Sequence, residues 1–185
     1  MTILTSLPKN LPVPHDDGAC SHLLDKSLPD IDLPSTQQTV INLSTIKGWT
    51  AVYCYPMTWQ PNVALPDGWD AIPGARGCTP QSCTFRDSFQ TLLDLNVQVF
   101  GLSRQNTEYQ QEAATRLHLP FALLSDNSLL FTQTLNLPVF KVSRMQLNKR
   151  VTLIACDGVI QHYFYPVFPP DKNVNDVIDW LELNV

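Results

Sequence analysis

The 185-residue sequence lacks long hydrophobic runs and runs of basic residues. No apolar stretch approaches the roughly 20 residues that a helix needs to cross a bilayer, and the N-terminus lacks a charged start followed by an apolar core. The net charge of -5 also argues against binding to nucleic acid or to anionic membranes. We therefore expect a cytoplasmic protein that binds neither nucleic acid nor membrane.

Cysteine is scarce as well, and its count is odd. Five cysteines are too few for a disulfide scaffold, so in a reducing compartment we expect buried or catalytic thiols. Cys54 lies in an apolar run and is predicted to be a core residue, whereas Cys156 follows a predicted strand and has no assigned role. Cys20 has His22 and the residues 15–17 beside it, which could be read as metal ligands. We expect a capped turn and a buried thiol there, because nothing fixes four ligands.

Charged residues make up only 16% of the chain, whereas hydrophobic residues make up 44%, which suffices for one domain with a sizeable core. The first residues differ from the rest, because Pro8, Pro12 and Pro14 deny them regular structure. Leucines between these prolines indicate that the segment packs on the remainder. We predict a Pro-rich N-terminal arm over 1–27 and a folded domain over 28–185.

From residue 39 onward, strand patterns alternate with helix patterns. The predicted strands and extended segments are apolar or rich in β-branched residues, and they cover 39–43, 49–55, 97–103, 120–126 and a hairpin at 149–160 that turns at Asp157-Gly158. Helices are predicted at 107–117, which holds polar and small residues, at 128–135, and at 173–183, where the apolar residues share one face. This order implies an α/β fold with a central mixed sheet covered by helices.

Two cysteines separated by four residues lie where a Gly/Pro-rich loop meets a helical pattern. Thr79 is predicted as the N-cap and Pro80 as the first helical residue. The apolar face that follows comprises Phe85, Phe89, Leu92 and Leu93. Cys78 then lies at a helix N-terminus, where free N–H groups and the helix dipole favour thiolate over thiol. This position suits thiol chemistry.

The spacing of Cys78 and Cys83 restricts any reaction between them. On an intact helix, residues five apart rise about 7.5 Å and point about 140° away from each other, whereas a disulfide needs Cβ atoms about 3.8 Å apart. The two cannot bond while both are helical. If they form a disulfide, the first turn must unwind, and the Gly/Pro composition before it favours that opening.

Gly77-Cys78-Thr79, followed after three residues by Cys83-Thr84-Phe85-Arg86-Asp87, resembles the active-site segment of the peroxiredoxin Q (bacterioferritin comigratory protein) group. The resemblance extends roughly from Leu28 to the C-terminus and implies a thioredoxin-like fold. In that family the first cysteine is peroxidatic and the second resolving, which implies these roles for Cys78 and Cys83. Arg150 matches a family arginine that projects to the peroxidatic sulfur, where its guanidinium could hold the thiolate and the peroxide oxygens.

The resemblance further implies a thiol-dependent peroxidase that reduces hydrogen peroxide or organic hydroperoxides and forms an intramolecular Cys-x4-Cys disulfide. An external dithiol protein of the thioredoxin or glutaredoxin type would restore both thiols. No metal or organic cofactor is needed for this chemistry. We expect a monomer or a homodimer.

The sequence departs from the family pattern Pro-x-x-x-Thr/Ser-x-x-Cys. An insertion of about fifteen residues separates Pro56 from Cys78, and Ala75 stands at the place of the family's hydroxyl residue. Thr58, if the loop folds back, or Thr79, beside the cysteine, could supply the hydroxyl, and the sequence does not choose between them.

The inserted loop at 57–77 contains too many glycines and prolines for a helix. It is expected to be a compact functional loop. Trp59 and Trp69 within it are expected to pack the loop or to line the mouth of the substrate site.

Three other functions are compatible with parts of this pattern. A thiol-disulfide oxidoreductase on the same fold usually presents Cys-x-x-Cys, so the four intervening residues count against it. A peroxide-sensing redox switch would share the first oxidation step, and the long loop and the missing local Thr keep this alternative open. A noncatalytic zinc module would use Cys78, Cys83, Cys20 and His22.

Overall fold

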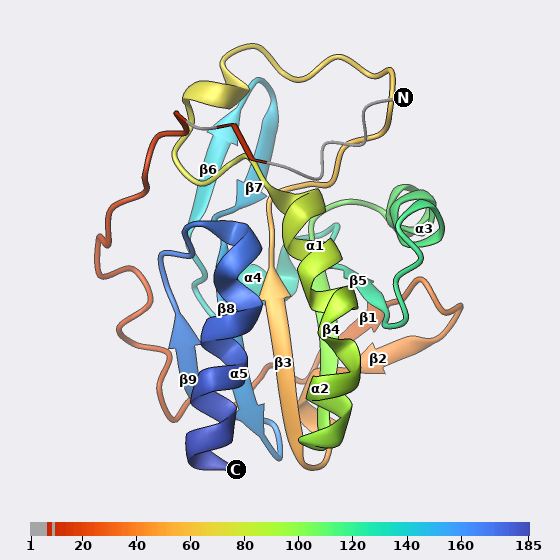
Figure 1. Ribbon diagram of the computed structural model, residues 1–185, viewed down its shortest axis with the longest axis vertical. Coiled ribbons are helices and arrows are strands. Elements are labelled where there is room, and N and C mark those ends of the chain that lie inside the picture. Colours follow the sequence, from red (N-terminus) through yellow and green to blue (C-terminus); the bar gives the residue numbers. More distant parts are fainter. Residues whose placement is uncertain (1–6, 9) are drawn as a thin grey trace.

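A five-stranded mixed sheet with strand order β5-β4-β3-β8-β9 forms the centre of the computed structural model, which describes residues 7, 8 and 10–185 (Figure 1). β3 (Trp49–Cys54), β4 (Val97–Ser103) and β5 (Leu123–Ser125) are parallel to one another. β8 (Val151–Cys156) runs antiparallel to both β3 and β9 (Val159–Phe164). The predicted mixed sheet is thus confirmed.

Helices cover both faces of this sheet. One face packs against α1 (Cys78–Asp87), α2 (Phe89–Asp94), α3 (Thr107–Arg116) and α5 (Asn173–Asn184). The other face packs against α4 (Leu130–Thr134), the short 3-10 helix η1 (Leu43–Thr45), and the small sheet of β1 (Asp32–Pro34) and β2 (Val40–Asn42). Side chains along a strand alternate between the two faces of the sheet, so both faces are apolar and need cover. In β3, Ala51 and Tyr53 point toward α1, α2, α3 and α5, whereas Val52 and Cys54 point toward the other face.

The hairpin turn at Asp157-Gly158 is confirmed, and both residues are left-handed, with φ of 49° and 77°. Two details of the predicted helices are wrong. The helix expected at 128–135 begins only at Leu130, because Leu129 is left-handed with φ of 59°. Leu93 is 44% exposed, because its neighbour Leu92 already faces the sheet and successive helical residues point about 100° apart.

A second hairpin, absent from the sequence prediction, consists of β6 (Val139–Val142) and β7 (Met145–Asn148). The inserted loop packs on it and contains the short 3-10 helix η2 (Trp69–Ala71). A separate apolar cluster joins the two segments: Trp69 and Ala75 from the loop are buried with Val142 and Leu147 from the hairpin. The loop is therefore compact, as expected, and it lies with the hairpin at one end of the sheet (Figure 1).

Part of the N-terminal segment packs on the second face of the sheet. Cys20 and Leu23 are buried in the core of that face, and Asp17 forms an ion pair with Lys149 at 2.6 Å. Residues 1–6 and 9 of the expected arm lie outside the described residues, and the division at residue 27 stays a prediction.

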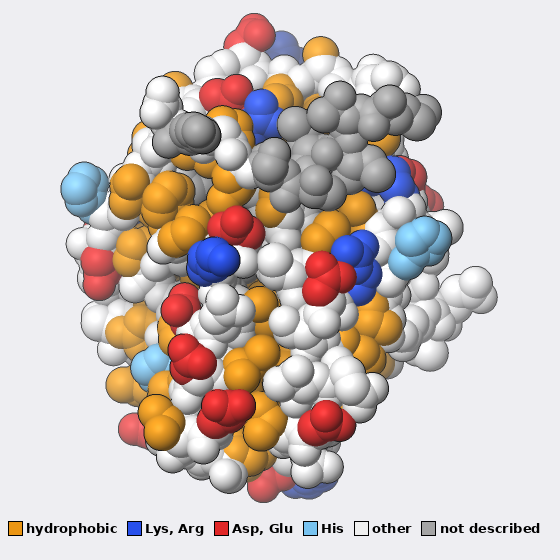
Figure 2. All heavy atoms as spheres, in the orientation of Figure 1, with side chains coloured by type: hydrophobic (Ala, Val, Ile, Leu, Met, Phe, Trp, Pro, Cys, Tyr) orange, Lys and Arg blue, Asp and Glu red, His pale blue; other side chains and the backbone are white. Residues whose placement is uncertain are grey.

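Over the face that carries α1, α2 and α5, acidic and basic side chains are scattered among apolar ones, without a continuous basic patch (Figure 2). Among residues 7, 8 and 10–185, no helix is both long enough and apolar enough to span a bilayer.

Candidate active site

Cys78 is the first residue of α1 and is only 4% exposed. The predicted cap is wrong: Gly77, not Thr79, is the N-cap, and Pro80 is the third helical residue. Gly77 is left-handed with φ of 103°, and a Cβ there would lie 2.3 Å from Cγ of Pro170, so glycine alone fits. Pro80 still occupies one of the first four positions of the helix, whose N–H groups have no partner within the helix. Its lack of an N–H therefore removes no hydrogen bond within α1.

Arg150 is the residue immediately before β8, and its side chain reaches Cys78. Its Nη2 lies 3.3 Å from Cys78 Sγ and also 3.2 and 3.1 Å from the backbone oxygens of Gly74 and Arg76. Arg150 as a whole is 3% exposed and therefore holds its positive charge largely out of water. The end of the inserted loop wraps around this cation, which fixes the loop against the cysteine.

A buried chain of hydrogen bonds holds Arg150 from behind. Its Nη1 donates to Oε1 of Gln81, which lies on α1 three residues after Cys78. Gln81 Nε2 donates to Oδ1 of Asn173 at 2.9 Å, and the hydroxyl of Thr152 donates to the same oxygen at 2.6 Å. Because Asn173 Oδ1 accepts from the Gln81 amide nitrogen, the Gln81 oxygen is directed at the guanidinium. The first residue of α5 is thereby connected to the first turn of α1.

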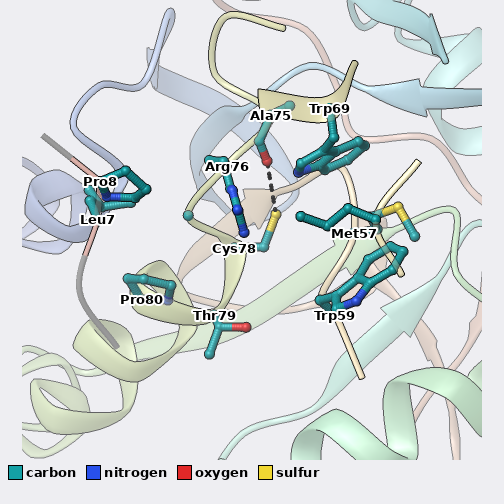
Figure 3. Close-up of a pocket in the computed structure, with 12 residues that line it drawn as sticks. Leu7, Pro8, Met57, Trp59, Trp69, Ala75, Arg76, Cys78, Thr79 and Pro80 are labelled. Atoms are coloured by element: carbon teal, nitrogen blue, oxygen red, sulfur yellow. Dashed lines mark hydrogen bonds between the residues drawn. The ribbon is translucent and has the colours of Figure 1, made fainter. Parts of the chain in front are cut away.

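A small pocket of about 40 Å³ opens beside the Cys78 sulfur. Met57, Trp59 and Trp69 line it on one side and Leu7 and Pro8 on the other (Figure 3). Since a cavity of roughly 10–15 Å³ holds one water-sized group, this pocket accommodates a group of a few heavy atoms. The two tryptophans therefore line the mouth of the site as well as packing the loop.

The sequence model of the family described as Redoxin matches residues 24–178. The chain belongs to the Redoxin family. Curated relatives of this redoxin include chloroplastic peroxiredoxin Q of Oryza sativa subsp. japonica, 25% identical over 83% of this chain and 64% of the rice protein. Another is chloroplastic peroxiredoxin Q of Sedum lineare, 26% identical over 83% of this chain and 75% of that protein. The chain spans less than two thirds of the rice relative's length.

Solved structures agree with this assignment. Peroxidoxin BcpB from Mycobacterium tuberculosis aligns with a TM-score of 0.71 at 19% identity, covering 88% of this redoxin and 97% of that protein. Peroxiredoxin Q from Xanthomonas campestris aligns with a TM-score of 0.67 at 15% identity, covering 94% and 98%. At these identities the likeness shows the fold alone. The predicted thioredoxin-like fold and the resemblance to the peroxiredoxin Q group are confirmed.

The two candidate hydroxyl residues of this redoxin differ in their surroundings. Thr79 lines the Cys78 pocket and is drawn beside the cysteine in Figure 3. Thr58 is fully buried, and its hydroxyl donates to Oε1 of Gln105 at 3.1 Å. The backbone N–H and carbonyl of Thr58 also bond to the Gln105 amide, at 2.8 and 3.1 Å. The Thr58–Gln105 pairing thus anchors the start of the inserted loop to the end of β4.

Cys83 of this redoxin lies on the same intact helix as Cys78, and both are free thiols. Burial raises the pKa of the Cys83 thiol above its usual value, although Arg86 nearby acts in the opposite direction. In the helical state burial therefore disfavours the thiolate form of Cys83 that would attack. The geometry agrees with the requirement that the first turn opens before the two sulfurs meet.

The remaining cysteines of the redoxin lie away from the pocket. Cys54 is fully buried, as predicted, and Cys20 belongs to the same core on the second sheet face. Burial, with Asp17 and Asp16 nearby, raises the pKa of Cys20 to about 12. Cys156 is half-buried beside the hairpin turn. Within the described part of the chain, no three His, Cys, Asp or Glu side chains gather as a metal site, and Cys20 lies across the sheet from Cys78.

The sequence indicated Cys78, Cys83 and Arg150 as candidates, and the structure brings Arg150 to Cys78; Gln81 and Asn173 were not among the candidates. Gln81 could have been identified from the sequence, because a residue three positions after Cys78 lies on the same face of the helix. Asn173 could not, because it is 92 residues from Gln81 in sequence and meets it only in the folded chain.

Proposed function

We propose that this redoxin is a thiol-dependent peroxidase in which Cys78 is the peroxidatic residue. The supporting observation is the contact of 3.3 Å between Arg150 Nη2 and Cys78 Sγ inside a pocket of about 40 Å³. A buried cation beside a sulfur at a helix N-terminus favours the thiolate, which is the nucleophile. The membership of the Redoxin family and the peroxiredoxin Q relatives support the same chemistry.

In the first step, the Cys78 thiolate attacks one peroxide oxygen along the O–O axis. The S–O bond forms as the O–O bond breaks, and the second oxygen leaves with the bonding electron pair. That oxygen takes a proton and departs as water or alcohol, while Cys78 becomes a sulfenic acid. Arg150 stabilises the negative charge that moves from sulfur to the leaving oxygen. We assign the supporting hydroxyl to Thr79, which lines the pocket, because the Thr58 hydroxyl is bonded to Gln105.

In the second step, Cys83 condenses with the sulfenic acid, forming a Cys78–Cys83 disulfide and releasing water. The first turn of α1 unwinds for this step, which exposes Cys83 and removes the burial that keeps its pKa raised. An external dithiol of the thioredoxin or glutaredoxin type then reduces the disulfide by exchange.

The substrates are hydrogen peroxide or organic hydroperoxides. One similar structure, the Xanthomonas campestris bacterioferritin comigratory protein, is described with alkyl peroxide reduction activity. The cytoplasmic location and the monomeric or homodimeric state stay predictions, and the curated relatives are described as chloroplastic.

Turnover of hydrogen peroxide with a thioredoxin or dithiothreitol as reductant tests the roles of the two cysteines. Cys78→Ser is expected to abolish turnover, because no other thiol lies in the pocket. Cys83→Ser is expected to keep the first oxidation and to lose efficient recycling through the disulfide. Cys156→Ser, which removes a half-buried thiol away from the pocket, is the matched control and should turn over normally.

Equal residual turnover in Cys78→Ser and Cys83→Ser would sink these role assignments. Rapid single oxidation with very slow turnover in the unmodified protein would favour the peroxide-sensing switch instead. Reduction of insulin disulfides at a rate that exceeds peroxide turnover would favour the thiol-disulfide oxidoreductase.

A further inference from the structure

A larger cavity of about 330 Å³ lies beside the Cys78 pocket, and no step described above uses it. We call it the Arg104 pocket; Arg104, Asn106, Asn127, Arg144 and Met145 are among its lining residues. Met57 lines both this cavity and the pocket of Cys78. The two cavities thus share the unbranched side chain of Met57, which lies next to the Cys78 sulfur in Figure 3.

The Arg104 pocket lies where parallel strands end. Arg104 directly follows β4, Asn127 follows β5 by two residues, and the β6–β7 hairpin contributes Arg144 and Met145. In open α/β sheets, ligands bind in the crevice outside the carboxyl ends of the strands. The position of this cavity is therefore that of a ligand site.

The charge of the pocket is positive, although the whole chain carries a net charge of -5. Arg104 is half-buried and donates to the backbone oxygen of Gln146 at 3.1 Å, while Arg144 is exposed. Within residues 7, 8 and 10–185, neither guanidinium pairs with a carboxylate, whereas Arg76, Arg86 and Arg116 all do. An adjoining cavity of about 310 Å³ shares both arginines and adds Lys141. This cluster of cations has no internal counter-charge and suits an anionic ligand.

We propose that the Arg104 pocket binds the carboxylate of an organic hydroperoxide whose peroxide group reaches Cys78. The small Cys78 pocket holds the peroxide group, the side chain of Met57 contacts the carbon skeleton, and the two guanidiniums pair with the carboxylate. Guanidinium and carboxylate are both planar and match as bidentate partners, so a carboxylate suits this site. This inference rests on the proposed peroxidase function; the bonds that form and break at sulfur are unchanged, and only the orientation of the substrate is new.

The test uses two hydroperoxides that differ in one charge: cumene hydroperoxide and its para-carboxylate. The rate constant for oxidation of reduced protein by each is measured by stopped-flow fluorescence, since Trp59 and Trp69 line the Cys78 pocket. The expected ratio of the carboxylated to the neutral rate constant is about ten in the unmodified protein, as one charge-assisted contact supplies. The double variant Arg104→Gln/Arg144→Gln should lower the ratio to about one. In the unmodified protein, 0.5 M salt should lower the ratio in the same way, because salt screens exposed charges.

The control is Lys26→Gln/Lys47→Gln, which removes the same charge from exposed positions outside the pocket and should keep the ratio. If the double arginine variant does not fold, the ratio is measured in Arg144→Gln alone. The Arg144 side chain is exposed, so its replacement leaves the core intact. A ratio near one in the unmodified protein, or the same loss in the lysine control, overturns the inference and leaves the peroxidase function standing. Failure of hydrogen peroxide and both hydroperoxides to oxidise Cys78 overturns the two together.

Discussion

Arg150 is the side chain that joins the separate parts of the site. It contacts the sulfur of Cys78, the backbone oxygens at the end of the inserted loop, and the amide of Gln81. A charge that is 97% shielded from water would be unfavourable without such partners, so the loop and α1 are held to it by the same contacts that hold it to the sulfur. Arg150 is thus a structural centre of the site, and its chemical role is the one proposed above.

Replacing Arg150 tests the chemical part of this role. Arg150→Gln is expected to slow oxidation of Cys78 by hydrogen peroxide about a hundredfold, because one preorganised donor to a developing charge is worth roughly that much. The readout is the second-order rate constant from tryptophan fluorescence, with the melting temperature measured alongside.

Arg76→Gln is the comparison for that experiment. It removes a second guanidinium near the pocket, but this one is paired with Asp70 at 2.6 Å. Its rate constant should change less than about fivefold, since an exposed ion pair contributes little. A folded Arg150→Gln protein that oxidises as fast as the unmodified protein would remove Arg150 from the chemistry.

At the scale of elements, the site includes a contact between α1 and α5, which are distant in sequence. In the proposed cycle, the first turn of α1 is rigid while Cys78 reacts and then unwinds so that Cys83 can reach the sulfenic acid. Asn173, the first residue of α5, holds Gln81 in that turn and is 1% exposed. We infer that α5 favours the closed turn and therefore sets the balance between oxidation and disulfide formation.

Asn173→Ala should shift this balance. Gln81 and Thr152 would each lose a buried hydrogen-bond acceptor, so oxidation of Cys78 should slow several-fold while the rate of disulfide formation rises. Rapid quenching and mass analysis of the sulfenic acid and the disulfide measure the two rates separately.

Asn184→Ala, at the exposed far end of the same helix, is the control and should alter neither rate. A parallel decrease of both rates in Asn173→Ala would mean that the contact only stabilises the fold.

At the scale of the whole molecule, the sequence predicted what depends on local pattern. The apolar run from Trp49 to Tyr55 and the Asp157-Gly158 turn identified the central strand and the hairpin, because a buried strand and a tight turn each restrict residue types locally. Cys78, Cys83 and Arg150 were found through the resemblance of one short motif and its spacing. The contact between Arg150 and Cys78 was not visible in the residues themselves.

The misses share a cause, which is contact between distant segments. Gly77 rather than Thr79 caps α1 partly because Pro170, 93 positions later, leaves no room for a Cβ. The β6–β7 hairpin was missed because Lys141 and Gln146 interrupt a short apolar pattern that is completed by Trp69 from the inserted loop. No local propensity encodes such contacts.

The most direct test of the account is peptide mass mapping of the reduced protein after one equivalent of hydrogen peroxide, with free thiols alkylated. The account predicts a Cys78–Cys83 disulfide within seconds, while Cys54 and Cys20, whose pKa values are raised by burial, stay reduced. Oxidation that is slow, or that centres on Cys20 or Cys156 while Cys78 remains a thiol, would contradict it.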